Sequence, residues 1–208
     1  MRDAAIFISI VFVYAITGAQ SNYEQDMHKA IDLWKNNQRT EAISAFETIA
    51  NSEKEKWLPF YYAAQIKIIS SFEERDEKNW SILLTAAQTD LDHAESLSNN
   101  NPEIKVLQAL LNTSYIAHDG RRYASLLSAE VEALYRIATL FAPENPRVLY
   151  CKAEWDMHAA QYSGSNSKTH CADLERALEL FAKFKPESPL HPNWGEARAK
   201  QLFNTCKG

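Results

Sequence analysis

The sequence ALYRIATLFAPENP occupies residues 133–146. Its apolar side chains recur at spacings of three and four, which is the spacing of one face of an α-helix. Pro143 follows the helical pattern directly, and Pro146 suits the first turn of a new helix, where its missing N–H costs nothing. The stretch therefore predicts two helices joined by a short turn.

The same spacing extends through the rest of the chain after Gln20. One stripe contains Met27, Ala30, Ile31 and Trp34, and a second contains Ala42, Ala45, Phe46, Ile49 and Ala50. The polar residues 36–39 separate the two stripes. A run of four to eight alternating β-branched residues, as in a half-buried strand, occurs nowhere in the sequence. The pattern therefore predicts an all-α fold.

Small and bulky residues also recur at matching places in successive helix pairs. A small residue recurs at Ala30, Ala64, Ala109 and Ala153, and a bulky one at Phe46, Leu91, Leu134 and Leu178. A second small position is matched by Ala42 and Ala87, and a third by Ala94 and Ala138. Small side chains at such places let neighbouring helices approach closely.

With the connector at residues 142–146, this pattern resembles the tetratricopeptide repeat, a unit of about 34 residues with two helices. The resemblance covers residues 23–186 and implies a right-handed α-solenoid of about four helix pairs. A C-terminal helix, residues 194–205, is expected to close the stack. Within the family, the chain resembles short exported bacterial proteins that have no assigned activity.

The repeat spacing departs from the family pattern. The gaps between the small residues at Ala30, Ala64, Ala109 and Ala153 are 34, 45 and 44 residues. The extra residues lie near 72–79, 118–122 and 161–170, at the turn between the two helices of a pair. Two interpretations stay open, namely longer helices with longer turns and a modified binding edge.

Composition excludes several functional classes. The 208 residues carry a net charge of −5, and the 22 Lys and Arg residues are dispersed among 27 Asp and Glu residues, which argues against nucleic-acid binding. The five glycines are too far apart for a nucleotide-binding loop or a nucleophile elbow. The six histidines form no metal-binding motif, so we expect no enzyme activity, catalytic residue, metal or cofactor.

Residues 1–19 have the pattern of a cleaved signal peptide. Arg2 precedes a largely apolar run, residues 4–16, and small residues follow at Gly18 and Ala19. A membrane span needs about 20 apolar residues, so the run favours cleavage over retention as an anchor. Residues 20–208 are then the helical domain, secreted or periplasmic and without stable membrane insertion.

Export makes a disulfide admissible, and three cysteines are present. Cys171 begins one predicted helix, and Cys206 ends the antiparallel helix that follows it. Both helices are roughly 18–20 Å long at 1.5 Å per residue, so the two cysteines are expected to meet. Cys151 is expected to stay a buried thiol.

In tetratricopeptide proteins the first helices of successive pairs line a concave groove. Carried over by repeat position, the resemblance implies the following groove residues: Trp34, Tyr61, Gln65, Thr113, Tyr150, Glu154 and His158. This mixed apolar and polar set suits an extended or helical apolar segment.

Three functions follow as hypotheses. The first is a protein or peptide interaction module with an unidentified partner. The second is a small-molecule receptor or enzyme with a pocket around Tyr61, Tyr150, Glu154 and His158. The third is a structural subunit of a cell-envelope assembly.

Overall fold

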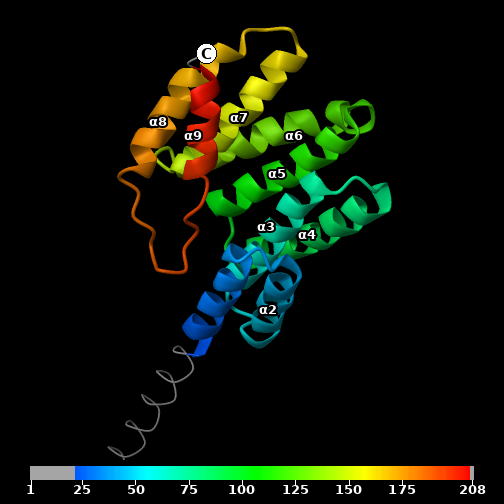
Figure 1. Ribbon diagram of the computed structural model, residues 1–208, viewed down its shortest axis with the longest axis vertical. Helices are drawn as coiled ribbons and strands as arrows, with labels where there is room; N and C mark the ends of the chain where they lie inside the picture. The colour runs from blue at the N-terminus through cyan, green and yellow to red at the C-terminus, as the bar shows by residue number, and fades with distance from the viewer. Residues whose placement is uncertain (1–21, 207–208) are drawn as a thin grey trace, which may run out of the picture.

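The computed structural model describes residues 22–206, and the predicted signal peptide lies outside these residues. The N-terminal helix covers residues 22–35. The α-helices that follow are α2 (Arg39–Ser52), α3 (Trp57–Glu73), α4 (Glu77–Leu97), α5 (Pro102–His118), α6 (Gly120–Phe141), α7 (Pro146–Tyr162), α8 (Cys171–Phe181) and α9 (Glu196–Cys206), with a 3-10 helix, η1 (Ser167–His170), before α8. Residues 22–206 contain no strand, so the all-α prediction is confirmed (Figure 1).

The helices pack as consecutive pairs. α3 packs on α4, α5 on α6, and α7 on α8, while α3, α5 and α7 also lie next to one another in that order. α9 packs on α8 and α7, as expected for the closing helix (Figure 1). The right-handed solenoid and its tetratricopeptide register stay predictions.

The small residues that recur in the sequence lie where helices meet. Ala30, Ala64, Ala109 and Ala153 are all buried. A methyl side chain at these positions lets two helix backbones approach to the 8–10 Å typical of close packing. The recurring alanines therefore have a packing role.

The extra residues of the longer repeats lengthen the helices. α3 and α4 have 17 and 21 residues, and only residues 74–76 separate them. α5 and α6 are separated by Asp119 alone. Figure 1 shows the two turns on the same side of the molecule. Longer helices therefore account for the insertion predicted at each of these two turns.

The buried side chains form two clusters. One includes Phe46, Tyr61 and Leu84 and lies among the helices up to α5. The other includes Tyr135 and Tyr150 and lies among α5 to α9. Trp194, in the segment between α8 and α9, packs against both clusters, so this segment connects the two halves of the core.

Candidate functional site

The residues predicted to line an open groove have unequal exposure. Tyr61, Gln65 and Tyr150 are buried. Trp34, Thr113 and Glu154 are partly buried, and the side chain of His158 is 60% exposed. The three buried side chains, on α3 and α7, are not open to a partner in this structure.

The chain itself covers part of this face. We call residues 182–195, between α8 and α9, the strap. Its Leu190 and Pro192 are buried, and the hydroxyl of Tyr62 donates a 2.8 Å hydrogen bond to the backbone carbonyl of Leu190. The strap then ends at Trp194, whose indole lies edge-on to the ring of Tyr150 with centroids 6.1 Å apart. The strap therefore covers α3 and α7 at the rings that the sequence assigned to the groove.

Gly195 allows the strap to pass close to α7. Its φ is +104°, a conformation that residues with a side chain rarely adopt. A Cβ atom at this position would lie 2.4 Å from Cε1 of Tyr150. Both the backbone angle and the available space therefore require glycine here.

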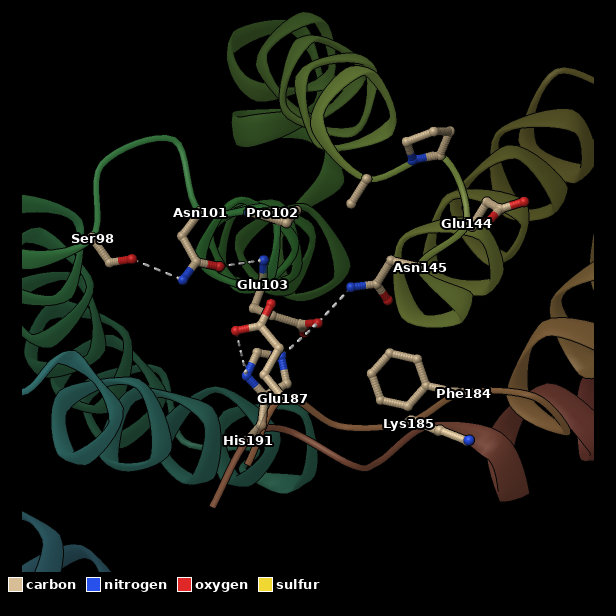
Figure 2. Close-up of a pocket in the computed structure, with 12 residues that line it drawn as sticks. Ser98, Asn101, Pro102, Glu103, Glu144, Asn145, Phe184, Lys185, Glu187 and His191 are labelled. Atoms are coloured by element: carbon tan, nitrogen blue, oxygen red, sulfur yellow. Dashed lines mark hydrogen bonds and ion pairs between the residues drawn. The ribbon is translucent and has the colours of Figure 1, made fainter. Parts of the chain in front are cut away.

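A recess of about 680 Å³ lies between the strap and the N-termini of α5 and α7. Figure 2 shows its polar side chains converging from the two helix N-termini and the strap. It is lined by Ser98, Asn101, Pro102, Glu103, Ala142, Pro143, Glu144, Asn145, Phe184, Lys185, Glu187 and His191. Most of its wall therefore comes from turns and helix N-termini.

A smaller recess of about 300 Å³ adjoins it and shares Glu144, Phe184 and Lys185. Its other lining residues are Arg176, Leu180 and Lys183. Three cationic side chains therefore surround Phe184, with Glu144 as the acidic residue among the six. We call the two recesses together the Phe184 recess.

The first turns of α5 and α7 are built alike and hold a buried ion pair. Asn101 caps α5 and Asn145 caps α7, and a proline follows each asparagine. Glu103 accepts hydrogen bonds from Arg147 Nε at 2.8 Å and Arg147 Nη2 at 2.6 Å, and both side chains are almost fully buried. Because each charge neutralises the other, the pair adds little net charge to the recess.

His191 is the one imidazole among the residues that line the recess. Its Nε2 lies 4.0 Å from Glu103 and its Nδ1 lies 3.7 Å from Glu187. Burial is the largest influence and lowers the pKa of His191, although both carboxylates act in the opposite direction. The imidazole is therefore neutral at pH 7, with a nitrogen lone pair available.

Glu154 and His158 form a small cluster at the surface away from the strap. Glu154 accepts hydrogen bonds from Arg198 of α9 and lies 3.9 Å from His158. Neither residue lines the Phe184 recess. In residues 22–206, no group of three or more His, Cys, Asp or Glu side chains is arranged to hold a metal ion.

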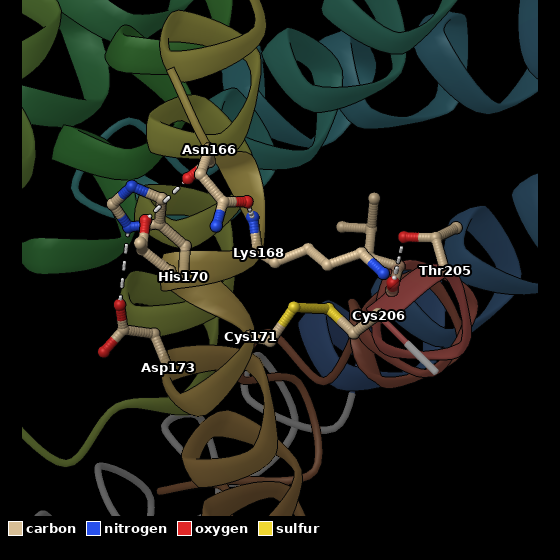
Figure 3. The surroundings of a disulfide bond; sticks show 9 residues. Asn166, Lys168, His170, Cys171, Asp173, Thr205 and Cys206 are labelled. Carbon is tan, nitrogen blue, oxygen red and sulfur yellow. Dashed lines mark hydrogen bonds and ion pairs between the residues drawn. A yellow bond between two sulfur atoms is a disulfide. The ribbon is translucent and has the colours of Figure 1, made fainter. Parts of the chain in front are cut away.

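The predicted disulfide between Cys171 and Cys206 is present. It joins the first residue of α8 to the last residue of α9, and the Cα atoms lie 5.9 Å apart (Figure 3). Cys151 is a buried free thiol, as predicted. Because the strap connects α8 to α9, the disulfide closes a loop that contains the whole strap.

Sequence reasoning did not identify the residues of the Phe184 recess. Residues 187–193 were interpreted as a proline-punctuated loop, and this loop contributes His191 and Glu187. A signal was present, because Leu190 is an isolated large apolar residue among prolines and polar residues. Such a residue indicates that the loop packs onto the fold.

Comparison with known proteins gives one informative likeness. No family model matches the chain, and no curated protein matches its sequence. The solved structure of the HusA haemophore from Porphyromonas gingivalis is similar, with a TM-score of 0.78 and 24% identity. The match covers 89% of this chain and 92% of the haemophore. At this identity the likeness shows that the two chains share a helical fold.

Among the described residues, no helix is both long and apolar enough to cross a membrane.

Proposed function

We propose that this protein is an exported binding protein for a haem-like tetrapyrrole, which it holds in the Phe184 recess. The observation that carries the proposal is the fold shared with a haemophore over almost the full length of both chains. The disulfide between Cys171 and Cys206 supports export, since structural disulfides persist in oxidising compartments such as the periplasm and the cell exterior.

The lining of the recess suits a flat, apolar ligand with carboxylates at one edge. Pro102, Pro143 and Phe184 supply apolar surface, and Arg176, Lys183 and Lys185 supply cations that attract carboxylates. A recess of about 680 Å³ falls within the range of roughly 300–1,000 Å³ that is usual for small-ligand sites. Iron in the ligand gives the neutral imidazole of His191 a bond to form.

A titration with haemin tests this proposal. We expect a saturable change in the Soret absorbance, and replacement of Lys183 and Lys185 by Glu should weaken binding about tenfold. Lys29→Glu, an exposed charge reversal on the N-terminal helix, is the matched control and should leave binding unchanged.

Iron-free protoporphyrin separates the role of the imidazole from that of the recess. His191→Ala should shift the haemin spectrum and leave protoporphyrin binding within about twofold. If neither tetrapyrrole binds saturably at micromolar concentration, the proposed function is wrong.

A second candidate is the peptide interaction module expected from the sequence. The observation that favours it is the strap itself, since an extended proline-containing segment lies against α3 and α7. A peptide partner would have to displace the strap to reach Tyr61 and Tyr150. Trp194→Ala should then increase the affinity for such a peptide, and a synthetic peptide of residues 183–194 is the probe.

A further inference from the structure

α6 has an apolar stripe on the side that faces away from its buried residues. The helix is buried through Val131, Tyr135 and Ala138. On the opposite side Leu126 is 67% exposed and Leu140 is 79% exposed. The full stripe consists of Leu126, Ala129, Ala133, Ile137 and Leu140. Large apolar side chains in this arrangement mark a contact surface.

Two charged residues flank the stripe. At 100° per residue, Glu130 and Arg136 lie about 60° to either side of Ala133 on the helix surface. Both are exposed, and within the described part of the chain neither has an ion-pair partner. Several other exposed charges on this molecule are paired, for example Arg176 with Glu179 on α8.

The stripe is complementary to a second copy of itself. Leu126 and Leu140 are both seven residues from Ala133, Ala129 and Ile137 are both four residues away, and Glu130 and Arg136 are both three away. If two α6 helices cross antiparallel at Ala133, each residue faces its mirror position on the other helix. Leucine then meets leucine, alanine meets isoleucine, and Glu130 meets Arg136 twice.

From this register we infer that the protein self-associates through α6 as an antiparallel two-fold dimer centred on Ala133. A two-fold interface needs a surface complementary to itself, and this stripe meets that condition in size and charge. The small side chain of Ala133 at the axis allows the two helices to approach closely. A different partner would have no reason to match the symmetry of the charges about Ala133.

The contact is small, because it uses one helix face from each copy. Stable interfaces bury roughly 1,200–2,000 Å² in total, and weaker transient contacts bury less. We therefore expect a dimer that dissociates in the micromolar range and that is seen only when concentration is varied. The stripe shares no residue with the Phe184 recess, so the inference stands apart from the proposed function.

Sedimentation velocity of the oxidised protein over a range of concentrations tests the inference. The unmodified chain should shift from monomer to dimer as concentration rises. Leu126→Ser with Leu140→Ser should weaken the dimer at least tenfold, because both apolar contacts are lost. These side chains are exposed, so circular dichroism and thermal unfolding should remain unchanged and will show that the fold is intact.

Charge reversal tests the register. Glu130→Arg alone places Arg against Arg136 of the other copy and should weaken the dimer about tenfold, and Arg136→Glu alone should do the same. The double variant, or an equimolar mixture of the two single variants, restores opposite charges and should restore the dimer. A chain that stays monomeric throughout overturns the inference. A dimer that ignores the leucine changes, or one that the double reversal does not restore, overturns it equally.

Discussion

The indole Nε1 of Trp194 donates a 2.8 Å hydrogen bond to the hydroxyl oxygen of Tyr61, which lies 133 residues earlier in the chain. Tyr61 belongs to the N-terminal core cluster, and the ring of Trp194 also meets Tyr150 of the C-terminal cluster. One strap residue thereby links two parts of the core that are built from different helices. The stability of the strap and that of the core are therefore coupled.

Trp194→Phe tests this coupling. Phenylalanine keeps part of the ring packing and removes the indole N–H, so the buried hydroxyl of Tyr61 loses its partner. An unpaired buried hydroxyl costs about 1–3 kcal/mol, and we expect a loss of that size in denaturant unfolding. Tyr162→Phe is the control: Tyr162 is 91% exposed, and its replacement should change stability by less than about 0.5 kcal/mol. Equal stability of both variants would contradict the link.

The buried pair of Glu103 and Arg147 should behave differently from a surface pair. Arg147→Met leaves the carboxylate of Glu103 buried without its cation and should cost about 3–5 kcal/mol. Replacing both residues, as Glu103→Leu with Arg147→Met, should recover most of that loss, because no buried charge then remains. Thermal and denaturant unfolding measure both effects.

Arg39 and Glu73 provide the matched comparison, because they form a two-pronged ion pair at the surface. Arg39→Met should cost less than about 1 kcal/mol, since water screens the exposed charges. A similar loss for Arg39→Met and Arg147→Met would show that burial does not set the strength of the pair near the recess.

The parts of the fold that follow local rules could be predicted from the sequence. Apolar spacing gave the all-α class, and the prolines at 102 and 146 marked the starts of α5 and α7. The bridge between Cys171 and Cys206 was predictable because two antiparallel helices of similar length bring their far ends together. Each of these inferences uses neighbours in sequence or adjacent helices.

The recess could not be predicted in the same way. Its wall depends on the path of the strap, and a segment without periodicity gives no pattern from which to derive its course. The repeat register placed Tyr61 and Tyr150 on one face, but it contains no information about what covers that face. The contact between Trp194 and Tyr61 joins positions 133 residues apart, which no local rule connects.

Two histidines should titrate in opposite directions. The hydrogen bond from Glu154 is the largest influence on His158 and raises its pKa, whereas burial lowers that of His191. NMR titration of the imidazole signals should place His158 above and His191 below the ordinary value of about 6.5. Glu154→Gln should return His158 toward the ordinary value and leave His191 unchanged.

These shifts have opposite effects on stability. The raised pKa of His158 stabilises the fold fully below about pH 6.5, and this contribution is lost as the pH rises through the raised value. The lowered pKa of His191 works the other way, since the unfolded chain takes up a proton first and stability falls as the pH drops below about 6.5. His191→Gln should therefore reduce the loss of stability between pH 7 and pH 5. An unchanged slope would show that another group causes it.

The disulfide should stabilise the C-terminal part of the fold. It closes a loop between residues 35 positions apart, and a loop of this length contributes about 3–4 kcal/mol in the chain-entropy account. Cys171→Ser with Cys206→Ser should lower the free energy of unfolding by that amount, because the unfolded chain regains the freedom that the bridge removes. Cys151→Ala, which removes the buried free thiol, should respond to reducing agent as the unmodified protein does. Mass spectrometry of the unreduced protein should recover a peptide that links Cys171 to Cys206, and free thiols at both positions would contradict the bridge.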